Sequence, residues 1–281
     1  MSRGFGAAHG AISVLNAIAT GAGGAVGIEL PIHVEVQLLD EPMATARSTA
    51  RGSRVPVDPA ILEAVLHTLE KRVGYRGGFH AEISSEIPVA AGLKSSHALV
   101  NSLLAGILDA LGHRLSVEEL ALLGVEASVR AGLTITGAYD DSLATLGRGV
   151  YITDNAGRRV LRHYRVDREL YAVVLVPPAT NPIWNVNPSD FQQLRECYMR
   201  AVKLALEGHW AAAMTVNGLL TAAATGQDVA LVREALELPE VISAGVSGKG
   251  PAFFAVTSSP EHVEDLWSGL RGELIVVRVL G

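Results

Sequence analysis

The segment that most constrains this chain reads Glu86-Ile-Pro-Val-Ala-Ala-Gly-Leu-Lys-Ser-Ser-His-Ala98. Just before it, residues 80–87 alternate between polar and apolar side chains, which predicts a strand. From Ala98 to Leu111, apolar residues recur at helical spacing, which predicts a helix. The segment is therefore expected to hold the end of a strand, a tight turn and the start of a helix.

This turn has the chemistry of a phosphate site. The first N–H groups of a helix lack partners within the helix and lie at its positive end, so they attract anions. Small residues at 90–92 allow a ligand close to the backbone, Ser95 and Ser96 offer hydroxyls, and Lys94 supplies a positive charge. The alternative is an ordinary helix start capped by a serine.

Composition limits the class of protein. The chain has 281 residues, 49% hydrophobic and 19% charged, which is enough for one large domain or two ordinary ones. A net charge of −6 and the lack of a long basic block argue against nucleic acid as a partner and favour a small molecule. The glycine-interrupted N-terminal region resembles neither a signal peptide nor a membrane span, so a cytoplasmic location is expected.

Metal clusters built on sulfur or imidazole are not expected. Cys197 is the only cysteine, which excludes an internal disulfide. The nine histidines include no pair at a spacing of three or four residues, so a histidine-held zinc site is not indicated.

A second polar stretch, residues 134–145, reads Thr-Ile-Thr-Gly-Ala-Tyr-Asp-Asp-Ser-Leu-Ala-Thr. The adjacent carboxylates of Asp140 and Asp141 suit a metal or a general base, because like charges held together raise at least one pKa. An Asx turn or a helix cap is the structural alternative. The helix before this stretch should begin at a capping box, Ser116-Val-Glu-Glu119, and it carries Glu126.

The rest of the chain divides into alternating strands and helices. Residues 26–39 read as a strand with an edge or bulge at Pro31, residues 20–25 as a ligand-facing loop or a hairpin connection, and 148–164 as a hairpin. Asp58-Pro59 opens a helix that Gly74 closes. A domain boundary is expected near residue 165. The elements expected beyond it are a strand at 171–176, a loop at 177–188, helices at 189–207, 209–224 and 228–237, strands at 241–247 and 252–256, a helix at 260–270 and a strand at 274–280.

A late glycine-rich turn carries another of the four lysines. Lys249 lies within Gly248-Lys-Gly-Pro251, whereas arginines, nineteen in all, are far more common in this chain. The turn is not a Walker A loop, because that spacing is absent and Gly250 stands where Ser or Thr should be.

The order Pro88-x-x-x-Gly-Leu-x-Ser-Ser96, an acidic Gly-x-x-Asp-Asp turn and a late glycine-rich turn resembles the GHMP small-molecule kinase superfamily over nearly the full chain. Three features make it similar to the archaeal type of shikimate kinase within that superfamily: Lys94, the doubled aspartate, and Asn16-Ala-Ile-Ala-Thr-Gly21. The resemblance implies an α+β fold of two domains, 1–164 and 165–281. The first would contain a left-handed βαβ unit, and the second would be ferredoxin-like.

The resemblance also implies a set of site residues. Asp140 and Lys94 would be catalytic, Ser96 and Glu126 would bind the metal, and an ion pair with Arg130 is the other possible role of Glu126. The substrate would be bound by Asp141, Gly137, Gly248 and Lys249. The nucleotide would be bound by Pro88, Ala90, Ala91, Gly92, Leu93, Lys94, Ser95 and Ser96.

The reaction implied is transfer of the ATP γ-phosphoryl group, with Mg²⁺, to a hydroxyl of shikimate. The alternatives are another alcohol such as homoserine or mevalonate, or a non-catalytic ligand-binding protein on the same scaffold. A carboxylate on the substrate calls for an arginine or a backbone nest, and the sequence singles out none of the nineteen arginines. It also leaves the oligomeric state open.

Overall fold

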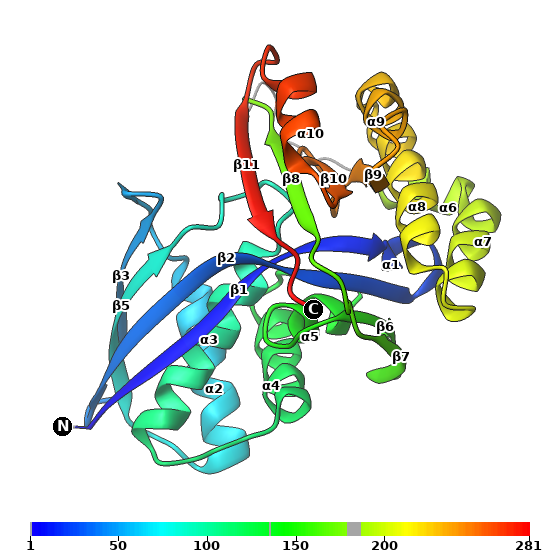
Figure 1. The fold of residues 1–281 in the computed structure, drawn as a ribbon. Helices are drawn as coiled ribbons and strands as arrows, with labels where there is room; N and C mark the ends of the chain where they lie inside the picture. Colours follow the sequence, from blue (N-terminus) through cyan, green and yellow to red (C-terminus); the bar gives the residue numbers. More distant parts are fainter. Residues whose placement is uncertain (1, 135, 179–186) are drawn as a thin grey trace.

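The computed structural model describes residues 2–134, 136–178 and 187–281, so Ile135 and most of the loop expected at 177–188 lie outside the described residues. Figure 1 shows two sheets, with helices α2 to α5 on one side of the long strands β1 and β2 and the smaller sheet on the other. Within the described residues, no helix has both the length and the apolar character needed to cross a membrane.

The larger sheet is built around a long hairpin. Strand β2 pairs with β1 along one edge, and on its other edge it pairs with β6 over residues 22–26 and with β5 over residues 32–39. The register between β1 and β2 shifts where Pro31 lies, so the predicted bulge is confirmed. The strands are β1 (Arg3–Leu15), β2 (Ala22–Leu39), β3 (Ala44–Ala50), β4 (Ser53–Arg54), β5 (Gly78–Ser85), β6 (Val150–Asp154) and β7 (Arg159–Tyr164).

One pair of strands in this sheet is parallel. Strands β3 and β5 run in the same direction and are joined through helix α2 (Pro59–Val73), which forms the βαβ unit of this half. The Asp58 side chain accepts the N–H of Ala60 at the start of α2, and Gly74 ends it with a left-handed φ of 73°. Both boundaries follow from the local sequence, as predicted.

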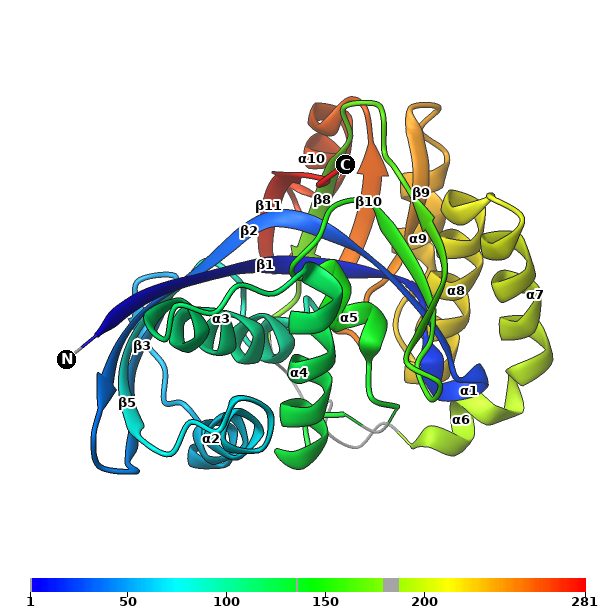
Figure 2. The same cartoon turned by 90° about the horizontal axis from the view of Figure 1, so that it is seen from below.

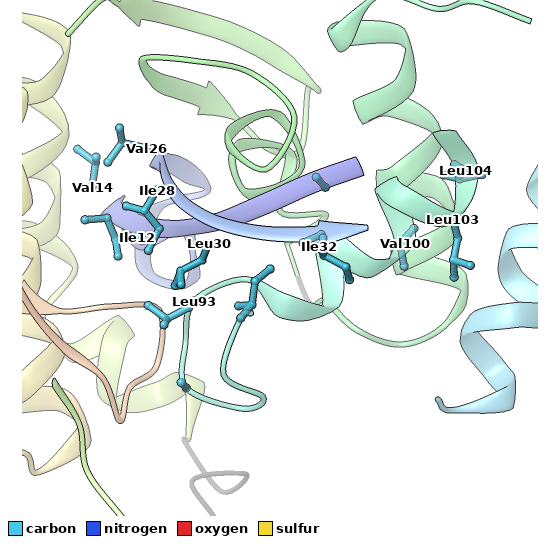
Figure 3. Close-up of a cluster of buried hydrophobic side chains, with 14 of the residues drawn as sticks. Ile12, Val14, Val26, Ile28, Leu30, Ile32, Leu93, Val100, Leu103 and Leu104 are labelled. Atoms are coloured by element: carbon cyan, nitrogen blue, oxygen red, sulfur yellow. The ribbon is translucent and has the colours of Figure 1, made fainter. Parts of the chain in front are cut away.

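Three helices follow α2 in this half: α3 (Ser95–Ala110), α4 (Val117–Arg130) and the short α5 (Tyr139–Ala144). Helix α4 begins at the predicted capping box, with both reciprocal hydrogen bonds between Ser116 and Glu119 present. Figure 3 shows the core between the hairpin and α3, where Ile12, Ile28 and Leu103 are fully buried. Leu93 joins this core, so its burial, worth about 1.5–3 kcal/mol, anchors the loop before α3.

The smaller sheet has the order β11-β8-β10-β9, and every neighbouring pair is antiparallel. Helices lie between its first and second strands and between its third and fourth, so the ferredoxin-like expectation is confirmed. The strands are β8 (Tyr171–Val176), β9 (Val241–Val246), β10 (Phe253–Thr257) and β11 (Glu273–Arg278). The helices are α6 (Pro188–Gln193), α7 (Arg195–Leu206), α8 (Trp210–Thr225), α9 (Val229–Leu236) and α10 (Pro260–Trp267).

The structure differs from the predicted elements in one helix and adds a short helix between β1 and β2. The helix expected over 189–207 is interrupted at Leu194, which separates α6 from α7. The stretch between β1 and β2 is a hairpin connection that contains a short helix, α1 (Ala17–Thr20), capped by the Asn16 side chain and ended by Gly21. Figure 2 shows α1 beside α6.

The two halves of the chain are also tied together at the C-terminus. Val279 forms an isolated bridge with Ile28, and Leu280 donates its N–H to Gly27 O at 2.9 Å. Strands β1 to β7 all precede residue 165 and β8 to β11 all follow it, but the end of the chain returns to β2. The boundary at 164/165 between two domains stays a prediction.

Candidate active site

The predicted phosphate loop ends in an unusual helix start. Lys94 is the N-cap of α3 in the left-handed region, with φ 66°, and no side chain caps the helix. The alternative of a serine cap is therefore wrong. Ser95 and Ser96 are half-buried, and neither hydroxyl hydrogen-bonds to any residue that the structure describes. The helix start thus presents free N–H groups and two free hydroxyls together.

Lys94 brings the first loop and the acidic turn together. Its Nζ lies 3.0 Å from Asp141 Oδ1 and donates to Ser13 Oγ at 2.7 Å. The side chains of Lys94 and Asp141 are only 9% and 15% exposed, so water screens the pair weakly. The two sequence motifs are thus in direct contact, and Ser13 of β1, which sequence reasoning missed, contacts the same lysine.

Asp140 lies beside this pair in the first turn of α5, and its residue is 4% exposed. Burial first, and then the neighbouring charge of Asp141, raise the pKa of Asp140 to about 7, against the opposing effects of Lys94 and of a hydrogen bond from Asn155. The carboxylate lies directly over Gly23, where an added Cβ would come within 2.4 Å of Asp140 Cγ. Only glycine fits beneath this side chain.

Neither aspartate caps α5. The N-cap is Ala138, with φ 43°, and it provides no side-chain hydrogen bond. Instead, Asn155 Oδ1 accepts the N–H groups of Tyr139 and Asp140, and Asn155 Nδ2 donates to Asp140 Oδ1 at 2.9 Å. The alternative of an aspartate cap is therefore wrong. The sequence places Asn155 only within the hairpin expected at 148–164, because it does not show that this hairpin packs against α5.

The late glycine-rich turn packs against the first loop. Ser247 Oγ donates to Gly92 O at 2.9 Å, and Gly248 N donates to Ser13 Oγ at 3.0 Å. Asn16 Nδ2 donates to Gly248 O at 2.8 Å. At Gly92, whose φ is 83°, an added Cβ would lie 2.4 Å from Ser247 O, so the contact requires glycine. The turn is thus held beside the phosphate loop.

The remaining predicted ligands lie around this contact. Ala91 and Leu93 are buried beneath the loop, whereas Ala90, with φ 59°, is exposed. Lys249 is exposed and makes no hydrogen bond or ion pair with the residues that the structure describes. Substrate binding by Gly248 and Lys249, and nucleotide binding by Pro88, stay predictions.

Glu126 forms ion pairs with two arginines. Arg72 binds both of its carboxylate oxygens, with Nε 2.9 Å from Oε2, and Arg158 Nη1 lies 3.5 Å from Oε1. The hydrogen bonds and charge of Arg72 lower the pKa of Glu126. The prediction of an ion pair with Arg130 is therefore wrong, because the partners of Glu126 are Arg72 and Arg158. Among the described residues, no three His, Cys, Asp or Glu side chains cluster as a metal site would require.

A cavity of about 550 Å³ adjoins the acidic turn. Asn155, which holds Asp140, and Gly137, predicted to contact substrate, both contribute to its wall. The lining residues are Ala17, Ile18, Ala19, Thr20, Gly21, Val129, Thr136, Gly137, Asn155, Ala156, Arg158, Gln192 and Arg195. Neither arginine was predicted as a site residue, since each reaches the cavity from an element distant in sequence.

Comparisons with known proteins show which family the chain resembles. A family model described as the GHMP kinases N terminal domain matches residues 60–149, which include the phosphate loop and Asp140. The shikimate kinase of Thermococcus kodakarensis is 41% identical, over 92% of this chain and 94% of its own length. That of Pyrococcus abyssi is 38% identical, over 97% of this chain and 98% of its own.

Solved structures share the fold at lower identity. The homoserine kinase of Cytophaga hutchinsonii superposes with a TM-score of 0.72 and 18% identity, covering 99% of this chain and 95% of that one. The mevalonate kinase of Staphylococcus aureus gives a TM-score of 0.68 and 17% identity, with both chains fully covered. The sequence relatives span nearly the whole chain, and these structures have its two-sheet fold. The chain therefore belongs to the GHMP kinase family.

Proposed function

We propose that this protein is a shikimate kinase, which transfers the γ-phosphoryl group of ATP to a ring hydroxyl of shikimate, giving shikimate 3-phosphate in aromatic amino-acid biosynthesis. The observation that carries the proposal is the ion pair between Lys94 and Asp141, which places the phosphate loop beside Asp140. Several relatives named shikimate kinase, 31–41% identical over nearly the whole chain, support this choice of acceptor.

The start of α3 would bind the phosphates of ATP. The N–H groups at the start of α3 and the hydroxyls of Ser95 and Ser96 donate to phosphate oxygens, and Lys94 neutralises their charge. Phosphoryl transfer depends mainly on positioning and on charge stabilisation, which donors fixed on a rigid helix start provide.

Asp140 acts at the acceptor end. A pKa of about 7 leaves its carboxylate able to take the proton of the acceptor hydroxyl at neutral pH, whereas an unperturbed aspartate would be a much weaker base. Asn155 fixes the orientation of the carboxylate, and Gly23 allows it to lie flat against β2. Asp141 stays paired with Lys94 and holds the turn in place.

Mg²⁺ is part of this proposal, and its predicted ligands fit unequally. When bound, the ion would neutralise charge on the phosphate oxygens. Ser96 fits as an oxygen ligand, because its hydroxyl has no partner among the described residues. Glu126 does not fit, because both of its carboxylate oxygens are bonded to Arg72.

We also propose that the reaction takes place in the cytoplasm and involves neither nucleic acid nor a membrane.

The test is ADP release from Mg-ATP by the purified protein with shikimate, homoserine, mevalonate or no acceptor. Release that depends on shikimate is expected. Release with homoserine or mevalonate alone would assign another alcohol to the same site, and no release with any acceptor, from protein shown to be folded, would contradict the proposed activity.

A further inference from the structure

We infer that Arg158 and Arg195 bind the carboxylate of the acceptor, and that Glu126 positions Arg158 for this contact instead of binding the metal. The inference rests on the proposed function and names residues that it leaves open. Both arginines line the cavity beside Asp140. Arg158 is the last residue of the turn between β6 and β7, and Arg195 begins α7.

The charge of the cavity selects an anion. Arg158 and Arg195 are the charged side chains in its lining, and no lining residue among those described is acidic. Thr20, Thr136 and Gln192 also line the cavity, and their polar groups suit hydroxyls. A cavity with two guanidinium groups, hydroxyl partners and small apolar residues such as Ala17 and Ala156 fits a small anionic polyol.

Both guanidinium groups have donors to spare. Arg158 uses Nη1 on Glu126, and Arg195 uses Nη1 on the carbonyl of Ala19. The Nε and Nη2 groups of both arginines have no partner in the part of the chain that the structure describes. Because a guanidinium presents its N–H groups in a planar fork, each arginine can still bind a carboxylate through two hydrogen bonds.

Two observations show that Arg158 is held in place. It adopts a left-handed backbone conformation, φ 49°, which a non-glycine residue occupies at some cost and keeps only where the surrounding structure holds it. Its side chain is tied to Glu126, which Arg72 in turn binds at both oxygens. This arrangement gives Glu126 a role that needs no metal.

One short turn sets the distance between the carboxylate site and the base. Asn155, which orients Asp140, accepts the N–H of Arg158 through its backbone oxygen at 3.3 Å. The same turn thus carries the side chain that fixes the base and one that would bind the carboxylate. A substrate held at its carboxylate would therefore present a hydroxyl at a fixed distance, which is the role of positioning in catalysis.

The test compares binding of shikimate with binding of its neutral carboxamide, measured by calorimetry on the full chain without ATP. Wild-type protein should prefer the carboxylate by about 10- to 100-fold, as expected for hydrogen bonds between charged groups. Arg158→Gln and Arg195→Gln should each lower this preference by about tenfold. Arg130→Gln, an exposed arginine outside the cavity, is the matched control and should leave the preference unchanged.

A second measurement separates the two roles of Glu126. Glu126→Gln should raise the KM for shikimate by about three- to tenfold, leave the Mg²⁺ concentration for half-maximal rate unchanged, and have no further effect on KM in the Arg158→Gln background. A raised Mg²⁺ requirement with an unchanged KM for shikimate would make Glu126 a metal ligand and overturn this part of the inference.

The remaining outcomes are equally decisive. Arginine variants that weaken the acid and the amide equally, or neither, would overturn the carboxylate assignment while leaving the proposed kinase activity standing. Wild-type protein that neither binds nor phosphorylates shikimate would overturn the proposed function, and the carboxylate assignment with it.

Discussion

Asn155 Nδ2 donates to Asp140 Oδ1 across 2.9 Å, while Asn155 Oδ1 accepts the N–H groups at the start of the helix that carries Asp140. One side chain therefore fixes both the backbone and the carboxylate of the proposed base. Asn155→Ala removes both contacts. We expect a loss of about 1 kcal/mol in the free energy of unfolding, as for other helix caps, and a drop in kcat of about ten- to a hundredfold.

The matched variant Asn155→Asp keeps the acceptor for the helix start but loses the donor and adds a negative charge. It should raise the pKa of Asp140 and shift the pH–rate profile to higher pH, because the added negative charge lies beside a buried carboxylate. Equal kcat values for Asn155→Ala and wild-type protein would show that the carboxylate needs no such support.

Asp140→Asn tests the base directly. We expect turnover to fall by about two to four orders of magnitude, because the acceptor hydroxyl loses its proton acceptor. Affinity for ATP should be largely kept, since the phosphate loop is untouched. Near-normal turnover in a folded variant would end the assignment of Asp140 as the base.

The raised pKa of Asp140 also makes stability depend on pH. The folded state binds a proton up to about pH 7, whereas the unfolded aspartate loses it near its ordinary value of 3.8. This group therefore contributes stability at low pH that is lost as pH rises through about 7. Asp140→Asn should accordingly raise the melting temperature at pH 8 and leave it unchanged near pH 3.5. Equal gains at both pH values would show that the effect does not arise from ionisation.

Lys94 serves structure and phosphate binding at once. Lys94→Met leaves Asp141 charged and largely buried, at a cost of about 3 kcal/mol, the lower end for a broken buried pair. Lys94→Met with Asp141→Asn should recover much of the stability in urea unfolding but not the affinity for ATP. Recovery of both would show that the lysine has no direct role at phosphate.

The contact between the two glycine-rich turns can be isolated with a paired substitution. Gly92→Ala and Gly112→Ala both place alanine at a positive φ, 83° and 76°, but only at Gly92 does the added Cβ meet another atom. Gly112→Ala should cost about 1 kcal/mol. Gly92→Ala should cost a further 1–3 kcal/mol or so and raise the KM for ATP, because Ser247 is displaced. Equal losses in chemical unfolding would contradict a tight contact.

Local signals predicted much of the fold. The caps at Asp58, Gly74 and Ser116 lie beside the helices that they bound, so the sequence alone locates them. The break at Leu194 was missed, because the residues around it continue a helical pattern and contain no glycine or internal proline.

The candidate site was predictable only where its residues belong to one motif. Lys94 and Asp140 stand in recognisable segments, but the partner of Glu126 is Arg72, on a helix 54 residues earlier, and not the nearby Arg130. That pairing depends on the packing of α2 against α4. Asn155 and Arg158 reach the site because their hairpin turns toward α5, which is a property of the tertiary fold.

Ser13 accepts hydrogen bonds from both Lys94 Nζ and the backbone of Gly248 on a single hydroxyl oxygen. A hinge motion that carried the late turn away from β1 would have to break the second bond, and it would leave the lysine with a less constrained partner. Movement of the late turn away from β1 and weaker binding of the nucleotide phosphates by Lys94 would then occur together. Release of ADP would require no separate trigger.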